Sequence, residues 1–113
     1  MVTLEDVREL ALSLPSTIEK SSYGTPGFRV TDKLFARIHD NDMWLVLMAD
    51  RSQRVFLHDA EPDKYFWTPH YENYDAFLVN LDAIDREELR DVLTMAWVFR
   101  APLRLVDAFR STL

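Results

Sequence analysis

A run of six apolar residues, Met43 to Met48, constrains the fold of this chain more than any other feature. The run is far shorter than the ~20 apolar residues that a membrane helix requires, and turn-forming residues 40–42 precede it. We interpret it as a β-strand that lacks the polar alternation of a half-exposed strand. Such a strand is either covered on both faces or leaves one apolar face for a partner or a ligand. We favour cover on both faces.

Turn residues around this run predict that it belongs to an antiparallel sheet. Thr31–Asp32 is expected to form a tight turn between two strands. Residues 21–27 contain both glycines of the chain and are expected to form an irregular loop. The other strands are expected at residues 28–30, 34–39, 65–67 and 76–81.

Apolar residues at three- and four-residue spacing predict two long helices. The first spans about residues 4–14 and begins after a capping box of Thr3 with Asp6. The second begins after a capping box of Asp85 with Glu88. Its buried stripe is expected to comprise Leu89, Val92, Leu93, Ala96 and Trp97.

Two shorter helices complete the predicted fold. Asp50 is expected to cap a helix that extends to about His58 and turns Val55, Phe56 and the stem of Arg54 toward the core. Pro102 is expected at the first position of a last helix. The order helix, strands, short helix, strands, helix, helix is typical of α+β folds, in which helices cover mainly one face of an antiparallel sheet. At 113 residues the chain has the size of one domain, so we expect a single domain over residues 1–113.

The residue types on which common catalytic and metal sites depend are scarce. Cysteine is absent, and two glycines are too few for a phosphate-binding loop. The three histidines lie 19 and 12 residues apart, which matches no local metal-ligand spacing. We expect no catalytic residue, no metal and no cofactor. The alternatives are a hydrolase in which His70 and Asp75 converge, and a cation on the acidic face of the first helix.

The net charge of −6, from 13 basic and 19 acidic side chains, opposes attraction of the whole molecule to nucleic acid or to an anionic membrane. The charge is uneven, because residues 59–91 contain ten acidic and three basic side chains. Residues 28–39 and 97–113 each have two more basic than acidic side chains. These segments either form one cationic patch or are ordinary solvated charge. The acidic N-terminal segment and the lack of a long apolar run predict a soluble cytoplasmic protein.

Aromatic rings near arginine form a second candidate site. One predicted loop contains Trp67, His70, Tyr71 and Tyr74, and Trp97 lies near the end of the second long helix. Aromatic faces beside arginines stack bases or bind a flat ligand. The alternative is packing within the core and the loop, because the chain contains seven Phe, four Tyr and three Trp in a small domain.

Four sequence blocks that together span most of the chain carry a family resemblance. They are Ala11–Pro15 (ALSLP), Tyr23–Val30 (YGTPGFRV), Lys33–Ala36 (KLFA) and Ala96–Leu105 (AWVFRAPLRL). In this order and spacing they resemble the bacterial MmcQ/YjbR family. The resemblance implies a CyaY-like α+β fold, DNA binding through two β-hairpin wings, and no enzymatic activity. The chain departs from the family pattern at Leu103, where relatives have lysine, and at Thr31–Asp32, where many have glycine with a base.

The leading hypothesis is therefore a non-enzymatic bacterial domain that binds DNA weakly. The resemblance and the two basic segments assign its phosphate contacts to Arg29, Lys33, Arg37, Arg100 and Arg104. The alternative is a module that binds another protein or a small ligand through the sheet face or the aromatic loop. Its contacts would come from Trp67, His70, Tyr71 and Trp97.

Overall fold

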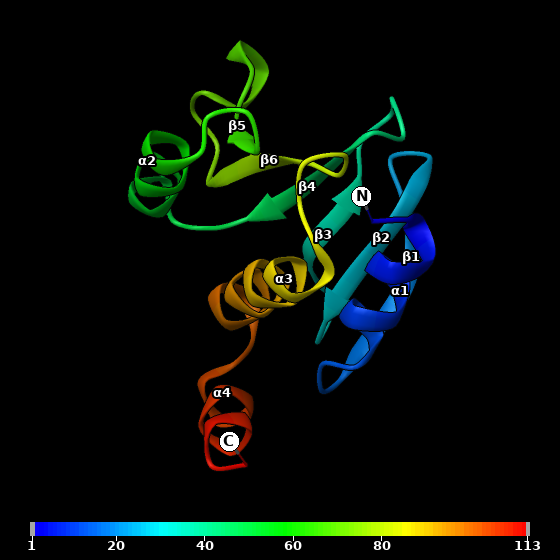
Figure 1. Cartoon of the computed structure of the whole chain (residues 1–113). Helices are drawn as coiled ribbons and strands as arrows, with labels where there is room; N and C mark the ends of the chain where they lie inside the picture. The colour runs from blue at the N-terminus through cyan, green and yellow to red at the C-terminus, as the bar shows by residue number, and fades with distance from the viewer. Residues whose placement is uncertain (1, 113) are drawn as a thin grey trace.

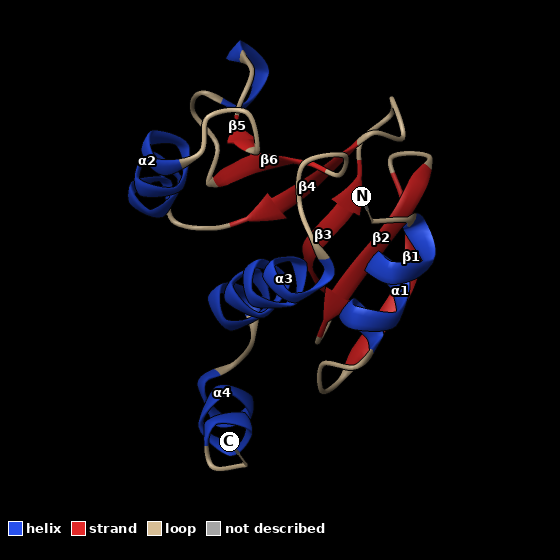
Figure 2. Cartoon of the chain, in the orientation of Figure 1, coloured by secondary structure: helices blue, strands red, loops and turns tan. Residues whose placement is uncertain are grey.

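Six strands form one antiparallel sheet in the order β1-β2-β3-β4-β6-β5 (Figure 1). The computed structural model describes residues 2–112. The strands are β1 (Thr17–Ser22), β2 (Thr25–Val30), β3 (Lys33–Ile38), β4 (Trp44–Met48), β5 (Tyr65–Phe66) and β6 (Ala76–Asn80). The helices are α1 (Leu4–Leu12), α2 (Arg51–Ala60), the short 3₁₀ helix η1 (Pro69–Tyr71), α3 (Arg86–Arg100) and α4 (Leu103–Arg110). The predicted α+β fold with an antiparallel sheet is confirmed (Figure 2).

Helices α1 and α3 cover one face of the sheet, and the main hydrophobic core lies between them and the strands (Figure 1). All five positions of the predicted stripe on α3 are buried. Strand residues such as Phe28, Leu45 and Leu47 meet this stripe, and none of the three has exposed surface. Burial of apolar surface in this layer is the main force that stabilises the fold. No helix among residues 2–112 is long and apolar enough to cross a bilayer.

Strand β4 is covered on both faces at its centre, as the unbroken apolar run predicts. Leu45 and Leu47 face the main core, whereas Val46 belongs to a second cluster on the opposite face, where Tyr71 covers it. The second cover is local, because Met48 on that face is only half-buried. The face of the sheet opposite α1 and α3, here called the open face, is therefore only partly covered.

The prediction of an irregular loop over residues 21–27 is wrong. β1 and β2 form a hairpin, and its two-residue turn Tyr23–Gly24 has φ values of 54° and 82°. Positive φ at both positions suits the twist of a tight hairpin. The apolar pattern missed β1 because this edge strand is polar, with only Ser22 buried. The first helix begins at the predicted Thr3–Asp6 capping box but ends at Leu12.

Helix α2 turns a different face inward from the one its apolar residues suggest. Val55 and Phe56 are 46% and 78% exposed, so the prediction that they face the core is wrong. Arg54, whose stem was also predicted to pack inward, is buried, and Leu57 packs against the main core. Residues three apart share one side of a helix, and here that inward side begins with an arginine. A pattern of apolar residues could not reveal it.

Glu88 connects β5 to the start of α3. Asp85 caps the helix by accepting a hydrogen bond from the Glu88 backbone N–H at 2.8 Å, as predicted. The Glu88 carboxylate accepts hydrogen bonds from Lys64 Nζ at 3.0 Å and from the Tyr65 hydroxyl, so the predicted capping box is only half formed. Burial raises the pKa of Glu88, but these two donors outweigh burial and hold the pKa below its ordinary value.

The β2–β3 hairpin is strained at its turn, where Thr31 and Asp32 have φ values of 45° and 68°. This region is costly for a β-branched residue such as threonine. The double substitution Thr31→Asn with Asp32→Gly, which gives the sequence this turn type prefers, is expected to raise the free energy of unfolding by about 1–2 kcal/mol. Urea unfolding should show a higher midpoint at an unchanged slope. Asp32→Gly alone should give the smaller share, and a midpoint that did not rise would exclude strain at this turn.

Candidate functional site

A bulge in β3 decides which side chains reach the open face. Arg29 pairs with Leu34, and the register then shifts by one residue, so that Phe35 has no partner on β2. Phe35 and Ala36 are consecutive and yet both are buried in the main core. Leu34 and Arg37, on either side of them, both face the opposite way and line a cavity. The bulge thus brings Arg29, Leu34 and Arg37 to one face.

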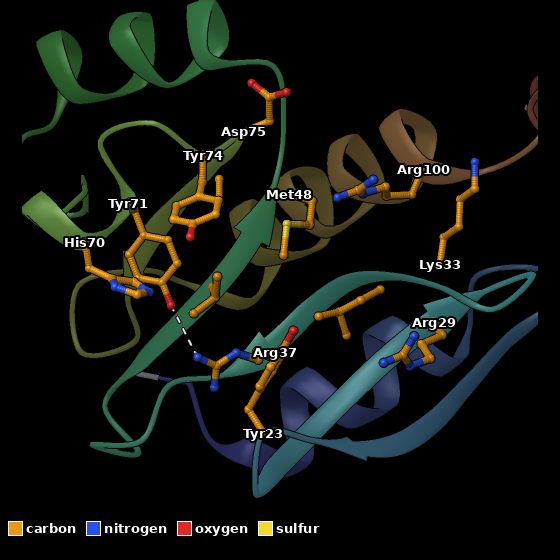
Figure 3. A pocket seen from close by; sticks show the side chains of 13 residues that line it. Tyr23, Arg29, Lys33, Arg37, Met48, His70, Tyr71, Tyr74, Asp75 and Arg100 are labelled. Atoms are coloured by element: carbon orange, nitrogen blue, oxygen red, sulfur yellow. Dashed lines mark hydrogen bonds between the residues drawn. The ribbon is translucent and has the colours of Figure 1, made fainter.

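A cavity of about 670 Å³ lies on the open face between the β2–β3 hairpin and the aromatic loop, residues 67–75 (Figure 3). We call it the sheet-face cavity. Its cations are Arg29, Lys33, Arg37 and Arg100, and its aromatic rings are those of Tyr23, His70, Tyr71 and Tyr74. Its apolar wall comprises Leu34, Val46, Met48 and Ala76. Asp75 is the one acidic residue among these lining positions.

Three of the four cations have no acidic partner in the described part of the chain. Arg29, Lys33 and Arg100 form no ion pair with any carboxylate of residues 2–112. The buried Nε atoms of Arg29 and Arg100 also have no hydrogen-bond partner there. Arg37 pairs with Asp40 at 3.4 Å, but Asp40 is exposed. The cavity therefore carries a surplus of positive charge that an anion would neutralise.

The backbone at Gly27 allows the Arg29 side chain to be held in place. Arg29 Nη2 donates to the Ser22 hydroxyl at 3.3 Å, and Nη1 donates to the Asp32 carbonyl oxygen at 3.2 Å. A Cβ atom at Gly27 would lie 2.7 Å from the Ser22 hydroxyl oxygen, closer than such atoms approach. Only glycine at this position leaves room for the Ser22 hydroxyl that orients Arg29.

Arg37 connects the cationic and aromatic sides of the cavity. Its Nη2 donates to the Tyr71 hydroxyl at 3.3 Å (Figure 3). Its Nη1 donates to the Thr25 hydroxyl at 3.2 Å. The guanidinium carbon also lies 5.3 Å from the ring centre of Tyr23, within reach of a cation–π interaction. Tyr23 is 81% exposed, so its ring is free to contact a ligand at the mouth of the cavity.

The aromatic loop is fixed from behind by Arg54, which is only 5% exposed. The Arg54 guanidinium donates at 2.8–3.1 Å to four carbonyl oxygens, those of Tyr71, Glu72, Tyr74 and Ala76. It also lies 4.1 Å from the ring centre of Trp67. Burial lowers the pKa of Arg54, although the Glu72 carboxylate opposes that shift. Three of the four acceptor residues line the sheet-face cavity, so Arg54 positions its aromatic wall.

The structure brings together four of the five cations predicted to contact phosphate. Arg104 lies in the first turn of α4, where it is exposed and outside the lining of the cavity. From the aromatic set, His70 and Tyr71 line the cavity, whereas Trp67 lies against Arg54.

Trp97 is part of the core, with no exposed surface, and its Nε1 donates to the Pro15 carbonyl oxygen at 3.0 Å. Trp97 therefore has no exposed surface with which to contact a ligand, so its predicted role in ligand binding is wrong.

His70 and Asp75 lie on the same cavity, as the hydrolase alternative requires. The Asp75 carboxylate, however, pairs with Arg51 at 3.2 Å. The His70 ring packs 4.7 Å from Tyr71 and 5.7 Å from Tyr74, between ring centres. Within residues 2–112 no group of three or more histidine, aspartate or glutamate side chains is arranged to hold a metal ion.

The model of the YjbR family matches residues 12–98, well over half of the chain. The chain belongs to the YjbR family. The match includes the β2–β3 hairpin and the aromatic loop but ends before Arg100 and Arg104. Two relatives are Uncharacterized protein Rv2570 of Mycobacterium tuberculosis and Uncharacterized protein Mb2600 of Mycobacterium bovis. Each is 33% identical over an alignment that covers 96% of both chains.

A solved structure has the same fold as this YjbR-family chain. The crystal structure of Deinococcus radiodurans protein DR2400, which has a DUF419 domain, superposes with a TM-score of 0.72 at 23% sequence identity. The superposition covers 87% of this chain and 78% of the other. At this identity the likeness concerns the fold alone. Family and fold therefore agree with the resemblance seen in the sequence blocks.

Proposed function

We propose that this YjbR-family chain binds nucleic acid, without enzymatic activity, through the cations of the sheet-face cavity. One observation carries the proposal: Arg29, Lys33, Arg37 and Arg100 come from three separate elements and meet at one cavity. Guanidinium and ammonium groups are the usual contacts for phosphate oxygens. Three of these cations lack acidic partners within residues 2–112, so their charge is available to a phosphate.

A local cationic surface is compatible with the net charge of −6. Exposed charges more than about 10 Å apart are largely screened at 0.1 M salt, so a bound phosphate responds mainly to its neighbours. Many acidic side chains elsewhere are already paired, for example Asp6 and Glu9 with Arg86. Four phosphate contacts nevertheless give only weak binding, and a rise from about 50 to about 200 mM salt should weaken it roughly 50- to 150-fold.

Lys33→Glu is expected to weaken binding about tenfold at low salt, because it removes one exposed phosphate contact and adds a repulsive charge. The slope of the logarithm of the binding constant against the logarithm of the salt concentration should also decrease in magnitude by about one. Fluorescence anisotropy of a labelled oligonucleotide, titrated at several salt concentrations, measures both effects. Arg90→Glu is the matched control, because Arg90 is exposed on α3, lies outside the cavity lining and changes the net charge equally.

The two variants separate a specific surface from general electrostatics. If Lys33→Glu and Arg90→Glu reduced the affinity for the oligonucleotide equally, only the total charge would matter. The cavity would then not be the binding site. Arg104→Glu should behave like Arg90→Glu, because Arg104 is also exposed and lies outside the cavity lining. An oligonucleotide anisotropy that stays flat with micromolar protein at about 50 mM salt would reject the proposal altogether.

A further inference from the structure

The sheet-face cavity has an aromatic side that phosphate contacts alone do not explain. Tyr71, Tyr74 and His70 line one end, and Arg29, Lys33 and Arg100 line the other (Figure 3). Met48 lies between the two ends, and Leu34 and Val46 add apolar lining (Figure 3). A ligand that fills this space must carry an anionic group and a flat apolar ring in one molecule. The cationic end binds the anionic group, and the aromatic end packs against the ring.

We infer that the sheet-face cavity holds one unpaired base of a single-stranded nucleic acid, whose adjoining phosphates contact the cations. The inference rests on the proposed function and names its ligand class, the single strand rather than the duplex. Single strands are bound by aromatic side chains that stack on bases, next to positive charges that follow the backbone. Both parts are present in this one cavity.

Duplex DNA does not match the shape and chemistry of the cavity. In a duplex the bases are paired and stacked inside, so only their edges and the sugar-phosphate backbone face a protein. The cavity volume of about 670 Å³ is within the range that encloses a ligand of moderate size. A duplex lying across the open face would contact the exposed cation Lys33 but leave the apolar and aromatic walls of the cavity without a partner.

The aromatic wall is held rigidly enough to act as a stacking surface. Arg54 bonds to the carbonyl oxygens of Tyr71 and Tyr74, and the Tyr71 hydroxyl accepts from Arg37. The Tyr74 side chain itself remains 56% exposed. A ring whose backbone is fixed and whose side chain is open loses little conformational freedom when a base stacks on it.

Tyr74→Ala removes an exposed ring while keeping the backbone carbonyl that Arg54 uses, so the loop is expected to stay folded. The probes are a labelled decathymidylate and a labelled ten-base-pair duplex, compared by anisotropy at about 50 mM salt. The wild-type chain is expected to bind the single strand at least tenfold more tightly than the duplex. Tyr74→Ala should weaken single-strand binding about five- to a hundredfold and leave duplex binding unchanged. Phe56→Ala, which truncates a 78% exposed ring on α2 outside the cavity, is the matched control and should change neither affinity.

The outcomes distinguish this inference from the proposed function. Suppose both probes bind with equal affinity, Lys33→Glu weakens binding and Tyr74→Ala does not. This result would overturn the inference of a bound unpaired base but support the proposed cationic interface. Binding of neither probe would overturn both. Saturable binding of adenosine monophosphate, lost in Tyr74→Ala, without binding of either probe would also overturn the inference, because it would assign the cavity to a free nucleotide.

Discussion

Arg54→Met is expected to lower the free energy of unfolding by about 3–5 kcal/mol. The substitution removes the donor for four carbonyl oxygens of the segment from Tyr71 to Ala76. The oxygens of Glu72 and Tyr74 then have no other hydrogen-bond donor within residues 2–112. It also removes the cation that lies over the Trp67 ring. Thermal unfolding followed by circular dichroism should show a midpoint lower by on the order of 15 °C.

Arg51→Met is the matched control, because Arg51 is on the same helix but half exposed and forms a single ion pair with Asp75. Its loss is expected to cost less than about 1 kcal/mol. Arg54→Lys should be intermediate, since an ammonium group keeps the charge but lacks the planar array of donors. If Arg54→Met were as stable as Arg51→Met, the aromatic loop would be held by its ring contacts and not by Arg54.

Trp97→Ala is expected to cost about 3–5 kcal/mol of stability, because a fully buried ring is replaced by a cavity. The Trp97 ring packs 5.1 Å from Phe109, between ring centres, and its Nε1 bonds to the Pro15 carbonyl oxygen. The residue therefore joins α3 to α4 and to the segment after α1. Urea unfolding measures the loss, and Trp97→Phe, which keeps most of the volume, should lose a smaller part of it.

Leu103→Ala is the control for this prediction, because Leu103 is 72% exposed on α4. A surface truncation of this kind usually changes stability by less than about 0.5 kcal/mol. If the Trp97→Ala protein had the same free energy of unfolding as wild type but no longer bound oligonucleotide, Trp97 would have no structural role. Such a result would favour the predicted ligand contact of Trp97.

The parts of the fold that follow from local periodicity could be predicted from the sequence. The stripe on α3 and the caps at Thr3 and Asp85 depend on residues three or four positions apart, and the structure has them. β1 could not be recognised because an edge strand needs no apolar face. The inward face of α2 was predicted only in part: the stem of Arg54 was expected there, but Val55 and Phe56 are exposed. The carbonyl oxygens that Arg54 bonds are 17 to 22 positions away, so the sequence could not indicate them.

The candidate site could be predicted only in its residue types. Short spacing within one hairpin indicated Arg29, Lys33 and Arg37, and the later basic segment indicated Arg100. Their meeting with Tyr71 depends on strand pairing across the sheet, which the sequence order does not specify. No residue-level pattern marked Gly27 as the position that leaves room for Ser22.

The extra residue in β3 also affects how sequences of this family should be aligned. Phe35 and Ala36 together occupy the place of one residue in the alternation, so the strand has the same inward and outward sides before and after them. A relative that is one residue shorter at this point would keep its equivalents of Leu34 and Arg37 on a common side. A single gap placed beside Phe35 is thus compatible with an intact surface, whereas the same gap in β4 would exchange the positions that face the main core with those that face the open face along the rest of the strand.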